Sequence, residues 1–180
     1  MRLKVGFLSL LVISVFASSV QAQTPQAEVF GGYSYFRLNP GGGASGENVP
    51  VGWHASVAGN INEWFGIAGD FSGHYKDIMG VDTSAHTFLF GPRFTVRDTG
   101  SVQPFAHVQF GGARLSASAG GISVSDTSFA MNFGGGVDVK IGDRLAWRAG
   151  QIDYLLTRFG GDSQNNFRFS TGIVLRIGSK

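Results

Sequence analysis

The closing stretch NNFRFSTGIVLRIGSK, residues 165–180, decides the fold class. Alternation of apolar and polar residues with a period of two is the pattern of a β-strand, because successive side chains point to opposite faces of a sheet. The chain therefore closes with a strand that has one apolar and one polar face. The apolar face holds Phe167, Phe169, Ile173, Leu175 and Ile177, and the polar face holds Arg168, Ser170, Gly172 and Arg176.

The same alternation recurs along the chain, and no convincing amphipathic helix follows residue 26. In the segment 144–156 its phase changes between Trp147 and Ile152, which predicts a one-residue bulge near Gly150. The pattern as a whole predicts an all-β chain. Its eight predicted strands are 27–38, 51–61, 64–75, 85–96, 102–115, 127–141, 144–156 and 166–177.

The connections between these strands alternate between short and long. Tight turns are predicted at 62–63, 98–101 and 142–143, whereas long polar loops are predicted at 39–50, 76–84, 116–126 and 157–165. In an up-and-down barrel, this alternation places the four long loops at one end and the three tight turns with both termini at the other. The same asymmetry is typical of transmembrane β-barrels.

The first residues have the anatomy of a secretory signal peptide. A basic start at Arg2 and Lys4 precedes an apolar run that is too short for a comfortable membrane span, and small residues precede a cleavage site after Ala22. We therefore expect residues 1–22 to be a signal peptide and residues 23–180 to form one domain.

Composition narrows the class of protein further. The chain has 28 Gly and 16 Phe but only 14% charged residues, whereas soluble domains have about 25%. It has no cysteine, which excludes disulfides, thiolate metal sites and a cysteine nucleophile. Arg2 and Lys4 account for the formal net charge of +2, so the mature chain is neutral and no nucleic-acid partner is expected.

The polar faces decide which side of the sheet lies outside. They carry small residues and charges of both signs, where a water-facing sheet would use Lys and Glu. Small residues suit a narrow lumen, and buried charges are tolerated when they are paired. The sequence thus predicts an eight-stranded antiparallel up-and-down transmembrane β-barrel whose apolar side faces lipid. Its predicted lumen charge network is Asp70, Arg93, Asp138, Lys140, Arg148, Asp153, Arg168 and Arg176.

Three stretches carry a family resemblance: AEVFGGYSYFRL at 27–38, FGGGVDVKIGDRLAWRAGQIDYLLTRF at 133–159, and the closing strand. With the signal peptide, they make the chain similar to small eight-stranded outer-membrane β-barrel proteins of Gram-negative bacteria, such as the OmpA-like transmembrane domain. The resemblance implies location in the cell outer membrane and contact with outer-membrane lipid.

The resemblance also implies a C-terminal insertion signal that the barrel assembly machinery reads. Its polar-x-Gly-x-x-apolar-x-apolar form is matched by Ser170, Gly172, Leu175 and Ile177. Ile177 departs from the form, since an aromatic residue is typical there, and so do the three residues that follow it.

The expected function is non-enzymatic: an envelope-structural barrel with four long surface loops that bind or adhere to a ligand the sequence does not identify. An eight-stranded barrel has an interior only wide enough for side chains or one small ligand. We expect no cofactor.

Three alternatives remain open. A lipid A-modifying hydrolase would use His54 as base, Ser56 as nucleophile and Asp70 as the orienting acid, although these positions fall on the lumen face. A metal site would use His54, His74 and His107, whose spacing matches no metal signature. A soluble periplasmic β-barrel lipid carrier would require the two faces to be exchanged.

Overall fold

The computed structural model describes residues 24–39, 46–78, 81–98, 100–120, 122–159 and 162–178. The predicted signal peptide, residues 1–22, lies outside them. No helix among these residues is long and apolar enough to cross a membrane. The strands within the described ranges are β1 Ala27–Leu38, β2 Glu47–Val49, β3 Val51–Asn60, β4 Phe65–Ile78, β5 Val81–Thr95, β6 Val102–Ala119, β7 Ile122–Lys140, β8 Leu145–Phe159 and β9 Asp162–Ile177.

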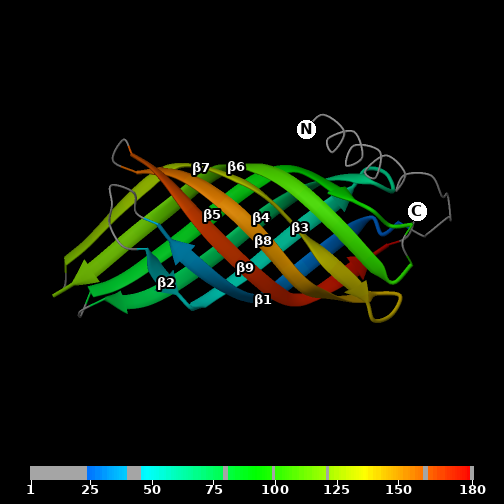
Figure 1. Ribbon diagram of the computed structural model, residues 1–180, viewed down its shortest axis with the longest axis horizontal. Coiled ribbons are helices and arrows are strands. Elements are labelled where there is room, and N and C mark those ends of the chain that lie inside the picture. Colours follow the sequence, from blue (N-terminus) through cyan, green and yellow to red (C-terminus); the bar gives the residue numbers. More distant parts are fainter. Residues whose placement is uncertain are drawn as a thin grey trace, which may run out of the picture.

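Antiparallel pairing of sequence neighbours, together with pairing of β1 to β9, closes the sheet into a barrel. Eight strands, β1 and β3 to β9, form the wall, and β2 is a three-residue addition to the end of β1. The barrel is elongated, and β1 begins and β9 ends at the same end as the tight turns (Figure 1). The predicted eight-stranded antiparallel barrel is confirmed.

The two faces of each strand are sorted as predicted. Val57, Phe90 and Phe133 are exposed on the outside of the wall, whereas their sequence neighbours Ser56 and Asn132 are buried inside it. Some large apolar side chains also point inward, because they lie on the same face of their strands as the buried polar residues. These are Phe30, Phe36, Leu89, Phe105 and Leu155.

A β-bulge occurs in β8 where the sequence predicted one. Val137 of β7 pairs with Gly150, but the next residue, Asp138, pairs with Arg148, so one residue of β8 has no partner. The extra residue shifts the phase of β8. Arg148 before the bulge and Asp153 after it are therefore both buried in the interior.

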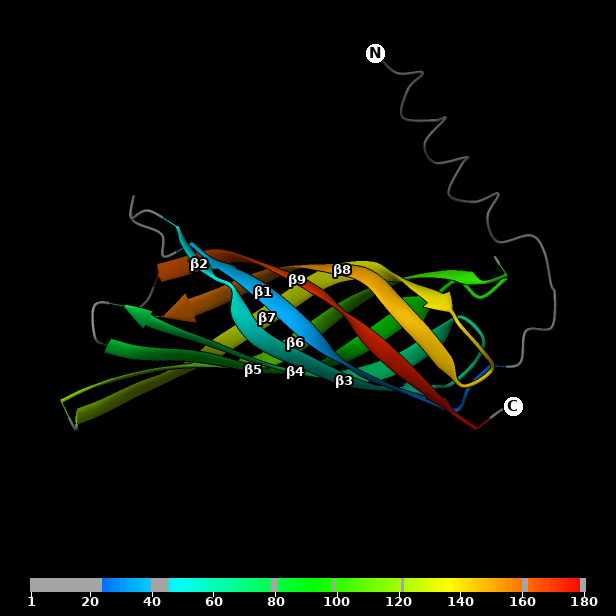
Figure 2. The same ribbon diagram turned by 90° about the horizontal axis from the view of Figure 1, so that it is seen from below.

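The prediction of long loops is wrong for three of the four connections. β4 and β5, β6 and β7, and β8 and β9 continue as paired strands through most of the segments 76–84, 116–126 and 157–165. Polar clusters of Gly, Asn, Asp and Ser suggested loops, but what a strand requires is a paired, pleated backbone, and hydroxyl and β-branched side chains in these segments also fit one. The resulting hairpins extend from the left-hand end of the barrel (Figure 2). The fourth connection, 39–50, contains β2, and its residues 40–45 lie outside the described ranges.

Candidate functional site

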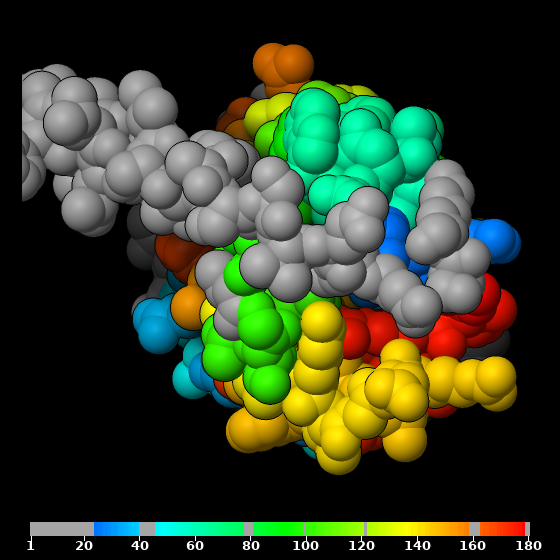
Figure 3. All heavy atoms as spheres, turned by 90° about the vertical axis from the view of Figure 1, so that its right-hand side faces the viewer, coloured from blue at the N-terminus to red at the C-terminus, as the bar shows by residue number. Residues whose placement is uncertain are grey.

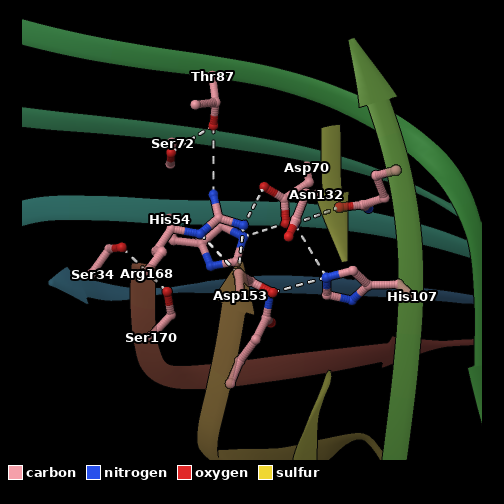
Figure 4. Close-up of polar contacts among 12 residues, drawn as sticks. Ser34, His54, Asp70, Ser72, Thr87, His107, Asn132, Asp153, Arg168 and Ser170 are labelled. Atoms are coloured by element: carbon pink, nitrogen blue, oxygen red, sulfur yellow. Dashed lines mark hydrogen bonds and ion pairs between the residues drawn. The ribbon is translucent and has the colours of Figure 1, made fainter. Parts of the chain in front are cut away.

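The centre of the lumen holds a cluster of buried charges around Arg168 (Figure 4). Its Nη2 atom lies 2.9 Å from Asp70 Oδ1 and 2.7 Å from Asp153 Oδ2. Each carboxylate has a histidine as a second partner: His54 Nε2 lies 2.5 Å from Asp70, and His107 Nε2 lies 2.9 Å from Asp153. One guanidinium thus connects two carboxylates, and five strands contribute to the cluster.

Neutral polar groups complete the surroundings of this central cluster. Thr87 lies within hydrogen-bond distance of Arg168 Nη1, at 3.5 Å, and its hydroxyl is 2.7 Å from that of Ser72. The amide of Asn132 donates to Gln109 at 3.2 Å. Buried charges are tolerated when such partners surround them, so this arrangement holds its side chains in fixed positions.

A second cluster lies nearer the turn end. This cluster has two carboxylates, and Arg93 contacts both: its Nη1 atom lies 3.3 Å from Glu28 and its Nη2 atom lies 2.9 Å from Asp138. Arg97 pairs with Glu28 at 3.0 Å, and Arg148 pairs with Asp138 at 2.8 Å.

Two of the inward-pointing aromatic rings, those of Phe30 and Phe105, belong to this second cluster. The guanidinium of Arg148 lies 4.1 Å from the ring centroid of Phe30 and 4.4 Å from that of Phe105, and Arg93 lies 4.2 Å from the Phe105 ring. These are cation–π distances. Phe30 and Phe105 therefore cover charged groups where they interrupt the polar face.

The structure distributes the predicted network over both clusters. Asp70, Asp153 and Arg168 meet in the central one, whereas Arg93, Asp138 and Arg148 meet in the second. The predicted set omitted Glu28 and Arg97, which are buried in the second cluster. The alternation of faces could have revealed Arg97, since it lies four residues after Arg93 and therefore on the same face.

The remaining two predicted network residues lie at the turn end of the lumen. Arg176 Nε is 3.7 Å from Glu28, and its guanidinium also donates to Gln103. Lys140 forms no ion pair within the described ranges. It lines a cavity of about 720 Å³ together with Arg144 and Arg176. Figure 3 looks onto this end, where the three tight turns surround the barrel axis.

The four residues of the predicted insertion signal occupy both faces of β9. Ser170 points inward, and its hydroxyl lies 3.2 Å from that of Ser34. Gly172 pairs with Gly32 across the β1–β9 seam, where an added Cβ would stand 2.5 Å from the Cα of Gly32. Leu175 and Ile177 are exposed on the outside of the wall.

The residues of the hydrolase alternative are enclosed in the lumen. His54, Ser56 and Asp70 are all buried. His54 Nε2 is bonded to Asp70, and no hydrogen bond joins Ser56 to His54 in the described part of the chain. A base that activates a serine must be within hydrogen-bond reach of it.

The three histidines of the metal alternative are held by different partners. His74 Nε2 lies 2.8 Å from the Ser34 hydroxyl, whereas His54 and His107 contact separate carboxylates. Among the residues that the structure describes, no group of three or more His, Cys, Asp or Glu is placed to hold a metal ion.

An apolar layer lies between the ion clusters and the hairpin end. Its buried members pack together, and the ring of Phe36 stacks on His74 at 4.8 Å. The interior thus consists of charged clusters covered by an apolar layer, and its side chains fill it, as expected for eight strands. The layer is formed by Phe36, Leu89, Ala113, Ala130 and Leu155.

Comparison with known proteins gives the family. The model of the outer membrane protein beta-barrel domain matches residues 8–174, so the chain belongs to that family. It is an integral β-barrel of the cell outer membrane. No match was found among the curated proteins.

Solved structures share the fold at low sequence identity. Neisserial surface protein A matches with a TM-score of 0.72 at 13% identity, over 84% of this chain and 97% of that one. Ail, the attachment invasion locus protein of Yersinia pestis, matches with a TM-score of 0.60 at 15% identity, over 84% of this chain and 99% of that one. The N-terminal beta-barrel domain of Pseudomonas aeruginosa OprF matches with a TM-score of 0.56 at 8% identity, over 85% of this chain and 100% of that one.

Proposed function

We propose that this protein is a non-enzymatic outer-membrane barrel whose extended hairpins present a binding surface outside the cell. The observation that carries the proposal is the contrast between the two parts of the molecule. Its interior is filled by paired charges and an apolar layer, while its hairpins leave side chains such as Ser125, Ile122 and Val124 exposed. A filled barrel is a rigid support, and exposed hairpins are the part that a partner meets.

The similar structures support this reading by analogy. Ail is described as an attachment invasion locus protein, and one of its structures holds the heparin analogue sucrose octasulfate. An adhesive role for the present hairpins would parallel it.

The remaining partners follow from the orientation of the barrel. We place the tight turns in the periplasm and the hairpins outside, as in other outer-membrane barrels. Outer-membrane lipid then covers the apolar belt, residues 1–22 act as a cleaved signal peptide, and the barrel assembly machinery reads Ser170, Gly172, Leu175 and Ile177. The protein needs no nucleic acid and no cofactor for this role.

Bacterial attachment tests the proposal. Cells that express the protein should attach to cultured epithelial cells more than vector-only cells do. A variant in which the β4–β5, β6–β7 and β8–β9 hairpins are shortened to tight turns should return attachment to the vector level. The unboiled gel mobility of each variant reports whether its barrel is folded. Equal attachment of all strains would contradict the proposal.

The hydrolase alternative has a separate test. Mass spectra of lipid A from cells with the wild-type protein and with Ser56→Ala should be identical. A lipid A species that depends on Ser56 would show that the barrel is an enzyme.

A further inference from the structure

The turn end of the lumen holds more positive than negative charge. In the second cluster, four positive charges face two negative ones among the described residues, which leaves an excess of two. Buried charges of one sign are costly unless charges of the other sign lie near them. This part of the lumen is therefore short of anions. The buried cations are Arg93, Arg97, Arg148 and Arg176, and the buried carboxylates are Glu28 and Asp138.

A cavity of about 720 Å³ lies beside this excess of charge, at the end of the barrel that faces the viewer in Figure 3. Pockets that hold small molecules commonly have about 300–1,000 Å³. Among the described residues that line the cavity, the cations are Lys140, Arg144 and Arg176, and the carboxylate is Asp143. Its lining thus adds to the positive charge of the lumen.

The lining also has hydrogen-bond donors that an anion can satisfy. Arg176 is only 7% exposed, and its Nε–H group has no hydrogen-bond acceptor among the described residues. Glu28 is 3.7 Å from that nitrogen, which is too far for a hydrogen bond. Gln103 accepts from Arg176 through its side-chain oxygen, so its remaining NH₂ group can only donate. A buried donor without an acceptor costs free energy, and an oxyanion in the cavity would supply acceptors.

We propose that this cavity at the turn end of the lumen binds a phosphate monoester. Such a group carries about two negative charges near neutral pH and several strong acceptor oxygens, which match the excess of charge and the donors of the lining. A carboxylate or a phosphate diester carries one negative charge and would leave part of the excess uncompensated. The site is separate from the hairpins, so it adds a second binding function. In the orientation proposed above, it opens to the periplasm.

Calorimetric titration tests the site with glycerol 3-phosphate as the probe. The folded barrel is kept in a neutral maltoside detergent at constant ionic strength, and we expect saturable binding of one molecule per barrel. Dimethyl phosphate and acetate each carry one negative charge and should bind at least about tenfold more weakly. Glycerol, which has no charge, should not bind.

Three variants test the lining of the cavity. Lys140→Met should weaken binding of glycerol 3-phosphate about tenfold, because it removes a cation from the lining. Asp143→Asn should tighten binding about threefold, because it removes a carboxylate that repels the anion. Arg158→Met is the matched control, since it removes one positive charge from the exposed face of β8 near the other end of the barrel, and it should leave the affinity unchanged.

The choice of variants keeps the fold intact. Arg176→Met is avoided because Arg176 also contacts the buried cluster through Glu28. Lys140 is half-buried and Asp143 is exposed, so their replacement leaves the buried ion pairs in place. The unboiled gel mobility of each variant reports whether its barrel is folded.

Lipid nanodiscs distinguish two sources of the same chemistry. A soluble phosphate monoester and the headgroup of phosphatidic acid carry the same phosphate group, whereas phosphatidylglycerol is a diester. Glycerol 3-phosphate is titrated into barrels in nanodiscs with either lipid at equal surface charge. An affinity about tenfold lower with phosphatidic acid would identify the lipid headgroup as the ligand. Equal affinities would identify a soluble phosphate monoester.

Several results would overturn the inference. These are the absence of saturable binding to the wild-type barrel, equal affinities for glycerol 3-phosphate and acetate, equal effects of Lys140→Met and Arg158→Met, or weaker binding by Asp143→Asn. The attachment experiment is independent of these outcomes. A barrel that binds glycerol 3-phosphate but confers no attachment would reject the adhesive role while the phosphate site stands, and the reverse result would reject the site alone.

Discussion

At the scale of single residues, Arg168 ties three strands of the barrel together. Its guanidinium contacts Asp70 of β4 and Asp153 of β8 from its own position in β9, and all three side chains are buried. Removing one member of a buried ion pair costs about 3–5 kcal/mol, because the other charge is left without a partner.

Arg168→Met should therefore lower the free energy of unfolding by about that amount or more, since two carboxylates lose the same cation. Urea unfolding in lipid vesicles, followed by tryptophan fluorescence, measures the change. Arg158→Met is the matched control, because Arg158 is exposed on the outer face of β8. Equal effects of the two variants would show that the central cluster does not stabilise the barrel.

Gly172 acts at the same scale through its lack of a side chain. It lies against Gly32 where β9 meets β1, with no room for a Cβ, whereas a Cβ on the nearby Gly31 would meet nothing within 4 Å. Gly172→Ala should impair closure of the barrel and reduce the fraction that shows folded mobility on an unboiled gel. Gly31→Ala should leave that fraction unchanged, and a loss in both variants would remove the steric explanation.

At the scale of elements, β7 runs from the barrel wall into the projecting β6–β7 hairpin. Phe133 lies on its outer face within the apolar belt, and Ser125 lies on the same outer face near the tip. We expect the lipid to end between these residues, because the outer face of β7 changes there from apolar to polar.

Phe133→Arg should cost about 2–4 kcal/mol and reduce assembly, because an arginine on the lipid face near the bilayer midplane is poorly solvated. Ser125→Arg should cost about 0–1 kcal/mol, since that position is beyond the lipid. Unfolding in vesicles of defined thickness measures both values. A similar cost at the two positions would place the membrane boundary elsewhere.

The elements also show where sequence reasoning failed. The alternation in ISVSDTS, residues 122–128, is as regular as in the barrel wall, but its faces are exchanged and hydroxyls dominate it. Composition therefore favoured a loop although the period favoured a strand. Pairing with β6 decided the outcome, because each strand of a hairpin supplies the other with backbone partners.

At the scale of the whole molecule, the lumen has two ion clusters and an apolar layer in series along the barrel. Vesicles that contain the protein should not admit solutes of the size of a disaccharide, since side chains fill an eight-stranded interior. Liposome swelling measures this, with a general porin in identical vesicles as the positive control. Swelling at the rate of the porin would mean that the lumen opens.

The sequence by itself determined the strands of the barrel wall, the bulge near Gly150 and the outward direction of the apolar face. The strands and the bulge follow from a period of two, and the direction of the apolar face follows from the small residues and mixed charges of the polar face; both are local properties of the chain. Only the tertiary structure decided that Glu28 pairs with Arg93 and Arg97, that Arg168 lies between Asp70 and Asp153, and that the tip of β7 pairs with β6 but not with β8. These features depend on how far each strand is displaced along its neighbours around a closed barrel, and no local pattern fixes that displacement.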